Sequence, residues 1–370
     1  YEIVTGAGAK ISSVSSSTYH YVTEPGPPLY KTSNHLTKTT TYSYVDDHNL
    51  VKQITSINSD QKEHSKIFKY VAEFAGNLAS KSNDDQGDVT SIAMDDMLQA
   101  NMIAAPVEEL EVVDGNVVGG KLYTYKRDNF NYVLDKTFNL SINSIPVAYT
   151  PSFFSSIGRI PDGGDYYYKF HQDANYYPVM EYVAYDNVGN LAEIRQPGGS
   201  STSYIYGYNN TLPVASVLNA SANECYATSF EGFEWWDGSP QNPSRYLSNN
   251  SFTGDYYLKV PANAFGFSIP LNVEDEDQEY ILSAYVKTSA NFGNNANLII
   301  QVVDETTSTQ LGWLNTVIGS TNNEWVYVER KVDLSQYTND CKLKLEVWNI
   351  HGTEDMAVDE LRFGPVDAQL

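Results

Sequence analysis

Short runs of alternating apolar and polar residues dominate the chain, and clusters of turn-forming residues separate them. One such run, 280–287, places four apolar side chains on the same face of a strand: Tyr280, Leu282, Ala284 and Val286. The run 298–303 is apolar on both faces, as a strand in the middle of a sheet would be. These patterns predict a mainly β protein.

One stretch has a different period. Apolar side chains recur at helical spacing over residues 91–104, up to Pro106, and Thr90 or Ser91 supplies an N-cap. We interpret the methionines of this stretch as core residues. A little further on, Asp114-Gly115 stands between two apolar runs, which predicts a tight hairpin turn. The sequence therefore predicts one short helix in an otherwise β-rich region.

The chain divides into blocks of different texture. Residues 1–39 are rich in Ser and Thr and predict an extended or irregular lead-in, and 40–218 carry short hairpins. Residues 219–366 hold at least seven strand-like runs, a number and spacing typical of a β-sandwich. A length of 370 residues agrees with two domains.

Charge narrows the range of partners. The chain has 46 Asp and Glu against 23 Lys and Arg, a net charge of −23, which argues against binding nucleic acid or an anionic membrane. The chain contains no run of about 18 apolar residues, so no segment is predicted to insert into a bilayer. The 29 Tyr suit a pleated surface. We expect a secreted or cell-surface protein.

The segment after residue 180 resembles a known repeat. Tyr185-Asp186 is followed by Gly189-Asn190-Leu191 and then by the strand-like run 203–209. This order is similar to the YD repeat of bacterial RHS-repeat proteins of the Bacteroidota type, and 44–50 resembles a degenerate second copy. The resemblance implies antiparallel hairpins stacked side by side, with Asp and Asn bonding the turn backbone. Such proteins wind β-shells, some around a toxin, or display adhesive modules.

A second resemblance covers about 225–365. Its elements come in the order of jelly-roll carbohydrate-binding modules, namely 229–231, 253–260, 280–287, Trp325 and 358–363. The resemblance implies a structural Ca²⁺ held by Glu231, Asp359 and backbone oxygens near Gly254 and Asp255. Alternatively, the two carboxylates are surface groups on adjacent strands.

Sugar recognition requires exposed aromatic faces with amides and carboxylates nearby. Five aromatic residues in or beside turn-rich loops are candidates: Trp235, Trp236, Tyr246, Tyr256 and Trp313. Adjacent residues on a strand point to opposite faces, so at most one of Trp235 and Trp236 is buried there. An exposed Trp would equally suit docking against the repeat region. We expect Trp325 and Trp348, in alternating runs, to be core residues.

The two cysteines leave two readings open. Cys225 and Cys341 form one bridge if the protein is exported, or they are two buried thiols. Six His show no HExxH spacing, and neither a nucleophile elbow nor a phosphate loop is present. We expect no catalytic residues, and no cofactor apart from the structural Ca²⁺.

Together these features predict a non-catalytic scaffold and recognition segment of a larger secreted or cell-surface RHS-repeat protein. Its jelly-roll module would bind a glycan, or a protein of the cell surface or secretion machinery. The alternative is a shell segment of a secreted toxin or effector whose catalytic domain lies outside this chain. A third reading is an accessory region beside a hydrolase.

Overall fold

A computed structural model describes most of the chain and confirms a mainly β fold. The described residues are 10–19, 35–46, 48–57, 61–74, 88–128, 131–142, 149–159, 166–208, 210–231, 245–247, 250–272, 279–304, 309–335, 337 and 341–369. They form one long antiparallel sheet, a two-stranded hairpin and the two sheets of a sandwich. None of their helices has the length and apolar character needed to cross a membrane.

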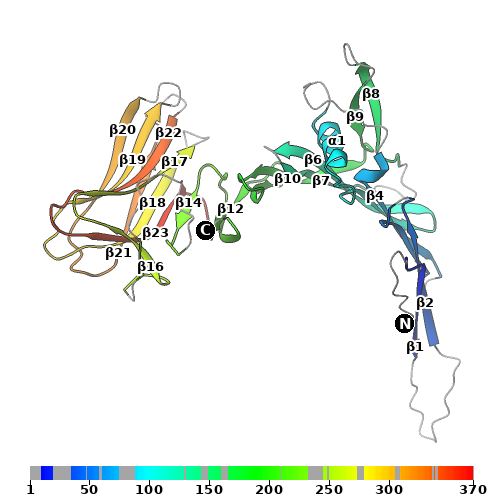
Figure 1. Ribbon diagram of the computed structural model, residues 1–370, viewed down its shortest axis with the longest axis horizontal. Coiled ribbons are helices and arrows are strands. Elements are labelled where there is room, and N and C mark those ends of the chain that lie inside the picture. The colour runs from blue at the N-terminus through cyan, green and yellow to red at the C-terminus, as the bar shows by residue number, and fades with distance from the viewer. Residues whose placement is uncertain are drawn as a thin grey trace, which may run out of the picture. The chain divides into compact units, whose positions relative to one another are not determined.

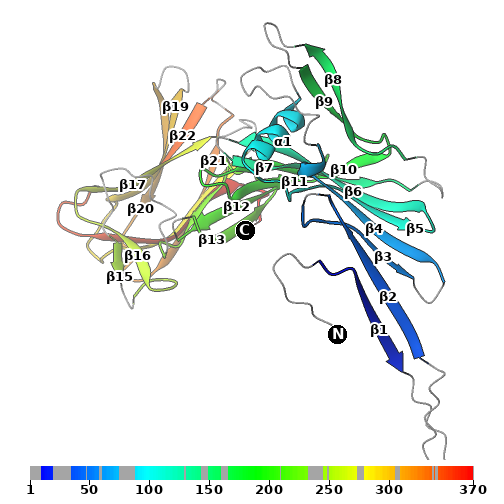
Figure 2. The same ribbon diagram turned by 45° about the vertical axis from the view of Figure 1, so that its right-hand side comes forward.

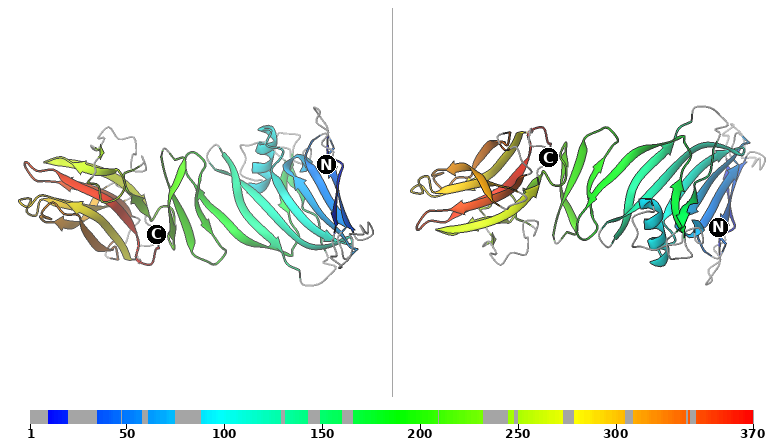
Figure 3. Two further views of the ribbon diagram at one scale, coloured as in Figure 1. Left: turned by 90° about the horizontal axis from the view of Figure 1, so that it is seen from below. Right: turned by 90° about the horizontal axis from the view of Figure 1, so that it is seen from above.

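The long sheet is a meander whose neighbouring strands follow chain order (Figure 3). Its strands are β1 (Ser13–Tyr19), β2 (His35–Tyr44), β3 (Val51–Ile57), β4 (Glu63–Tyr70), β5 (Pro106–Val113), β6 (Asn116–Asp128), β7 (Asn131–Leu140), β10 (Tyr176–Tyr185), β11 (Leu191–Arg195), β12 (Ser201–Gly207) and β13 (Leu212–Leu218). The separate hairpin pairs β8 (Phe153–Arg159) with β9 (Tyr166–His171). Short turns join β5 to β6, β6 to β7 and each successive pair from β10 to β13, as antiparallel neighbours allow, whereas longer segments join β1 to β2, β4 to β5 and β7 to β10.

Local turn chemistry explains the meander. Asp114 and Gly115 both have positive φ, 48° and 77°, and join β5 to β6 as the sequence predicts. The lead-in 1–39 contains more structure than expected, because β1 pairs with β2 from its first residue to its last. The Ser and Thr side chains of this segment suit a solvated hairpin, although no apolar alternation marks it.

The predicted helix is present and shorter than its apolar pattern. Helix α1 (Val89–Gln99) follows the 3₁₀ turn η1 (Val71–Phe74), and its N-cap is Asp88, whose Oδ1 accepts a 2.8 Å hydrogen bond from the Ser91 N–H. Figures 1 and 2 show α1 on one face of the sheet near β6 and β7. Met94 and Met97 are buried against Leu122, which confirms their core role, whereas Met102 is 40% exposed and the same prediction is wrong for it.

The sandwich consists of two antiparallel layers (Figure 1). The six-stranded sheet contains β14 (Tyr226–Thr228), β15 (Arg245–Leu247), β16 (Tyr256–Val260), β18 (Glu279–Lys287), β21 (Val326–Asp333) and β23 (Met356–Pro365). The four-stranded sheet has the order β17 (Ala264–Asn272), β22 (Cys341–Asn349), β19 (Ala296–Asp304) and β20 (Gln310–Ile318). β19 is a central strand, as its apolar run predicts. The four alternating side chains of 280–287 are all buried in the core between the sheets.

The chain forms two compact units, 1–181 and 182–370, so the division falls earlier than the expected boundary at 218. Within the second unit, hydrogen bonds join β11–β13 to the sandwich. Ser203 Oγ donates to the Ala220 carbonyl (2.7 Å), and Leu218 exchanges two backbone hydrogen bonds with Gln369 (2.8 and 3.0 Å). The change in sequence pattern near residue 218 marks where the strands of the sandwich begin. The compact unit starts earlier because these contacts hold β11–β13 against the sandwich.

Candidate functional site

The outer face of the four-stranded sheet carries the strongest candidate site. On β22, buried Leu343, Leu345 and Val347 point into the core, so the alternate residues Lys344, Glu346 and Trp348 share the opposite face. On the neighbouring strands, Gln301 pairs with Lys344, and Trp313 pairs with Gln301. The same face therefore gathers aromatic, charged and amide side chains.

Three aromatic rings form a strip across this face, which we call the aromatic strip: Phe265, Trp348 and Trp313. The ring of Trp348 meets that of Phe265 edge-on, with centroids 5.3 Å apart, and lies 6.4 Å from that of Trp313. Trp313 keeps 43% of its surface exposed. The strip thus offers apolar ring surface to a ligand lying across strands β17, β22, β19 and β20.

Polar groups beside the strip are held in fixed positions. Glu346 is only 4% exposed although it lies on the outer face. Its Oε2 accepts from the Trp348 indole N–H (3.0 Å), and its Oε1 pairs with Lys344 Nζ (2.8 Å). Gln301 Nε2 donates to the side-chain oxygen of Gln310 (3.3 Å). A carboxylate, an ammonium and amides set next to aromatic rings are the groups that bind sugar hydroxyls.

Of the five aromatic candidates from sequence, Trp313 alone lies in this strip. Trp235 and Trp236 lie outside the described residues, and for Tyr246 only the backbone, in β15, is described. Tyr256 begins β16 on the side of the strand that carries buried Leu258 and is itself half-buried. These residues are therefore not brought together with Trp313 in the part of the chain that the structure describes.

The prediction that Trp325 and Trp348 belong to the core is wrong. Trp348 alternates with the buried residues of β22, so its own strand pattern already assigned it to the outer face. Trp325 precedes β21 and packs edge-on against Phe252 and Tyr257, outside the core between the sheets. Alternation shows which residues share a face, and only the flanking apolar residues show which face is inward.

The residues proposed from the resemblance to hold calcium do come together. Glu231 Oε1 accepts from the N–H groups of Asp255 (2.8 Å) and Tyr256 (2.7 Å). Asp359 Oδ2 accepts from the N–H groups of Phe252 (2.9 Å) and Thr253 (3.1 Å). Two carboxylates thus clamp the loop between β15 and β16, and we call this arrangement the carboxylate clamp.

The donor set of this clamp differs from the expected calcium site. The loop turns N–H groups toward both carboxylates where a calcium ion needs oxygens, and the Gly254 carbonyl accepts from Ser251 Oγ (2.7 Å). Among the described residues, no three His, Cys, Asp or Glu side chains are grouped closely enough to hold a metal ion. The described conformation does not fit the ion, and structural calcium stays a prediction.

Asp359 is the electrostatically unusual member of the clamp. Its side chain is fully buried, and burial raises the pKa of its carboxyl to about 6, although three backbone N–H bonds act in the opposite direction. The third of these bonds comes from Glu360 N–H to Oδ1, at 2.8 Å. Folding therefore removes this carboxyl from water, and its hydrogen bonds hold the loop in place.

Cys225 is a free thiol in the structure, so the bridge to Cys341 is not formed. The thiol is buried and donates to the Ser221 carbonyl at 3.4 Å, and burial raises its pKa to about 12. Cys341 begins β22 opposite Asp304, and its side chain is outside the described part. The reading as an inert buried thiol holds for Cys225.

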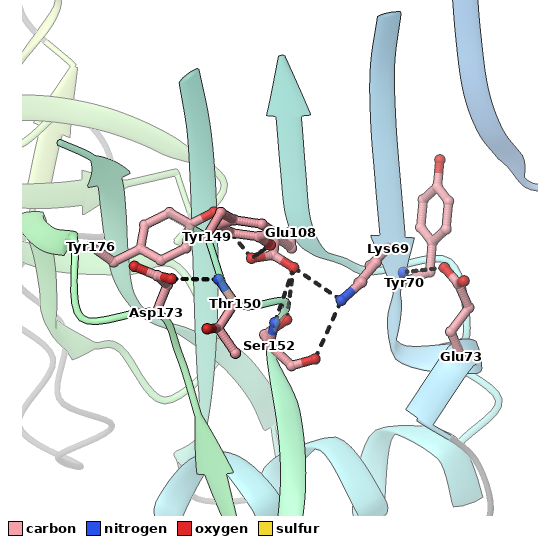
Figure 4. A network of polar contacts seen from close by, with 9 residues as sticks. All are labelled: Lys69, Tyr70, Glu73, Glu108, Tyr149, Thr150, Ser152, Asp173 and Tyr176. Carbon is pink, nitrogen blue, oxygen red and sulfur yellow. Dashed lines mark hydrogen bonds and ion pairs between the residues drawn. The ribbon is translucent and has the colours of Figure 1, made fainter. Parts of the chain in front are cut away.

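Sequence reasoning missed a network around Glu108 of β5 in the first unit (Figure 4). Glu108 is fully buried, and its Oε1 accepts from the hydroxyls of Tyr149 and Tyr176 (3.1 Å for Tyr176). Its Oε2 accepts from Ser152 Oγ (2.9 Å) and pairs with Lys69 Nζ (3.2 Å). A carboxylate occupied on both oxygens anchors the segment 149–152 to the sheet, so we interpret this network as structural.

Comparison with known proteins gives fold similarities only. The chain matches no protein-family model and no curated protein. One similar solved structure is "Family 16 Carbohydrate Binding Module-2", at 18% identity and TM-score 0.27, covering 37% of this chain and 94% of that one. The CBM22-1 xylan-binding domain from Paenibacillus barcinonensis matches at 17% identity and TM-score 0.27, covering 38% and 93%. TmCBM61, solved with β-1,4-galactotriose, matches at 11% and 0.24, covering 38% and 88%.

Proposed function

We propose that the chain is a non-catalytic scaffold and recognition segment whose sandwich binds glycan on the aromatic strip. The observation that carries this proposal is the outer face of the four-stranded sheet, where half-open aromatic rings stand next to Glu346, a carboxylate already fixed by two partners. Rings stack on the C–H faces of sugars, and fixed polar groups orient the hydroxyls. An open sheet face can contact several successive sugars in the middle of a glycan chain, whereas a closed pocket would hold only its terminal sugar.

The test is a glycan array with the full chain, followed by titration calorimetry on the oligosaccharides that bind. Trp313→Ala should weaken binding at least fivefold, about 1 kcal/mol, because it removes an exposed stacking surface. The control is Tyr177→Ala, which removes an aromatic ring that is 49% exposed on β10 and should leave the affinity unchanged. An array with no bound glycan would refute the proposal.

The scaffold part of the proposal rests on the turn between β10 and β11. Asp186 Oδ1 accepts from the N–H groups of Val188 (3.0 Å) and Asn190 (2.8 Å). Asn190 Nδ2 donates to Asp186 Oδ2 (2.9 Å) and also to the carbonyl of Asn210 (2.6 Å), in the turn between β12 and β13. One asparagine thus ties two neighbouring turns, which supports a repeat of stacked hairpins like that of RHS proteins.

Three further expectations belong to the same proposal. A secreted or cell-surface location agrees with the acidic surface, and secretion assays with the full gene would test it. Structural calcium is tested by thermal melts with calcium and with chelator, in which equal midpoints argue against the ion. The gene sequence on either side of this chain tests the larger polypeptide and decides between a displayed module and a toxin shell.

A further inference from the structure

The opposite sheet of the sandwich carries a pocket that the aromatic strip does not touch. It has a volume of about 300 Å³ and lies over the outer side of β18, β21 and β23. Its lining residues are Phe252, Ser283, Tyr285, Tyr327, Glu360 and Arg362, together with Thr253. Inward-pointing Leu282, Ala284 and Val286 alternate with the lining residues of β18, so the pocket faces solvent and not the core.

Two aromatic surfaces stand in this pocket. Phe252 stacks on Tyr285 with ring centroids 3.5 Å apart and planes at 15°. Tyr327 lies 5.4 Å from Tyr285 and is tilted by 54°. Phe252 is 40% exposed and Tyr327 is 49% exposed, so apolar ring surface remains open to a ligand.

Among the lining side chains the charges of Glu360 and Arg362 cancel, and the Tyr327 hydroxyl donates to Glu329 Oε2 (2.6 Å) beside the pocket. Glu360 Oε2 accepts from Arg362 Nη2 (2.7 Å), and Glu360 Oε1 accepts from Thr253 Oγ1 (2.6 Å). A guanidinium has five N–H donors and a carboxylate about four acceptor positions, so both retain capacity for a ligand. The arginine disfavours a cation and the glutamate disfavours an anion. A neutral ligand with several hydroxyls and an apolar ring face fits this lining.

The backbone beneath the pocket is fixed in advance. Glu360 has φ +46°, uncommon for a residue with a side chain, at a register shift between β18 and β23. This bulge leaves Asp359 buried, where it holds the N–H groups of Phe252 and Thr253, and turns Glu360 to the pocket. The carboxylate clamp therefore positions one wall of the pocket, and a preorganised wall lowers the entropic cost of binding.

We propose that this pocket is a second glycan-binding site, which takes one neutral sugar residue independently of the aromatic strip. Its volume is at the lower end for ligand pockets and suits a single ring. Phe252 and Tyr327 contact the C–H face of the sugar. Glu360, Arg362 and Ser283 bind its hydroxyls.

The test is saturation-transfer NMR and titration of the full chain with five methyl glycosides: those of glucose, galactose, mannose, xylose and N-acetylglucosamine. At least one should bind with a millimolar Kd, and Tyr327→Ala should weaken it tenfold or more. Arg362→Gln should weaken it too, because it removes the partner of Glu360. Trp313→Ala should leave this Kd unchanged, since Trp313 lies on the other sheet.

Four results would overturn the proposal. One is that no glycoside of the panel binds. Another is that Tyr327→Ala keeps full affinity, or that Trp313→Ala abolishes binding of the same glycoside. The last is that choline or glucuronate binds more tightly than every neutral glycoside, because the pocket would then select charge. Oligosaccharide binding that is lost only in Trp313→Ala, in a protein that binds none of the five methyl glycosides, leaves the aromatic strip supported and refutes the pocket alone.

Discussion

Replacing Glu108 tests whether a single buried carboxylate organises the first unit. In Glu108→Ala, Lys69, Ser152 and the two tyrosine hydroxyls lose their common acceptor (Figure 4). Removing one partner of a buried ion pair costs about 3–5 kcal/mol, because the remaining charge and donors stay buried without a partner. Lys69 is partly exposed, with 24% of its side chain accessible, and regains some hydration. We therefore expect the lower end of that range, about 3 kcal/mol.

A control on the same strand separates burial from charge. Glu111 pairs with Lys66 at 3.5 Å, and both side chains are more than 60% exposed, at 61% and 63%. Glu111→Ala removes the same carboxylate in a solvated setting, so it should cost about 0–1 kcal/mol. The two substitutions change net charge equally, and any difference between them reports the buried contacts.

The assay uses the uneven distribution of tryptophan. All five Trp lie beyond residue 181, so their fluorescence reports the second unit, while far-UV circular dichroism reports both. In urea, with a slope of about 2 kcal/mol per M, a loss of 3 kcal/mol moves the midpoint of the first unit by about 1.5 M. Hydrogen exchange should rise in peptides covering 106–125 and not in those covering 296–304. Equal midpoints for Glu108→Ala and Glu111→Ala would refute the reasoning.

Three other substitutions or treatments test the second unit. Gly254 has φ +59°, and a Cβ at this position would collide with Glu231 Oε1. Gly254→Ala should therefore lower the unfolding free energy by about 1–3 kcal/mol in urea titrations. The control Gly352→Ala, where nothing lies within 4 Å of an added Cβ, should lower it by about 0.5 kcal/mol or less. Burial raises the pKa of Asp359 to about 6 from 3.8, so the stabilising contribution of this group is present below about pH 4 and is lost as the pH rises through 6. Asp359→Asn should flatten the stability curve in that window, and an unaltered slope contradicts this origin. Cys225, with its thiol pKa raised to about 12 by burial, should resist iodoacetamide at pH 8 until urea unfolds the unit; rapid labelling of folded protein would contradict that burial.

The periodicity of apolar residues and the identity of the turn residues made much of the fold predictable. The sequence pattern over 280–287 predicts a one-sided strand, and Asp114-Gly115 predicts a tight turn, because both depend on residues adjacent in the chain. The helix was also predictable, but its N-cap was not. Thr90 or Ser91 was the expected cap, whereas the structure shows Asp88, which accepts hydrogen bonds from the N–H groups of Ser91 and of Phe170, the second 82 residues away.

The sites were harder to predict because distant segments build them. The pocket joins Phe252, Tyr327 and Arg362, which come from three strands or loops far apart in sequence, and no local pattern relates them. For Trp348 the information was available, since it alternates with buried neighbours; the expectation of a core residue used the alternation of the run without asking which of the two faces points inward. The family resemblance predicted that Glu231 and Asp359 meet the same loop. It did not predict that the N–H groups of this loop point toward the two carboxylates.

The backbone hydrogen bonds between Leu218 and Gln369 bring the two ends of the sandwich together. The polypeptide leaves the meander at residue 218 and, after the whole sandwich, returns to the same point. A replacement head of another shape would have to match that junction and the bonds that Ser203 and Glu193 make beside it, to the Ala220 carbonyl and the Ala222 N–H. A sandwich of different sequence could therefore be joined to the same hairpins at this junction.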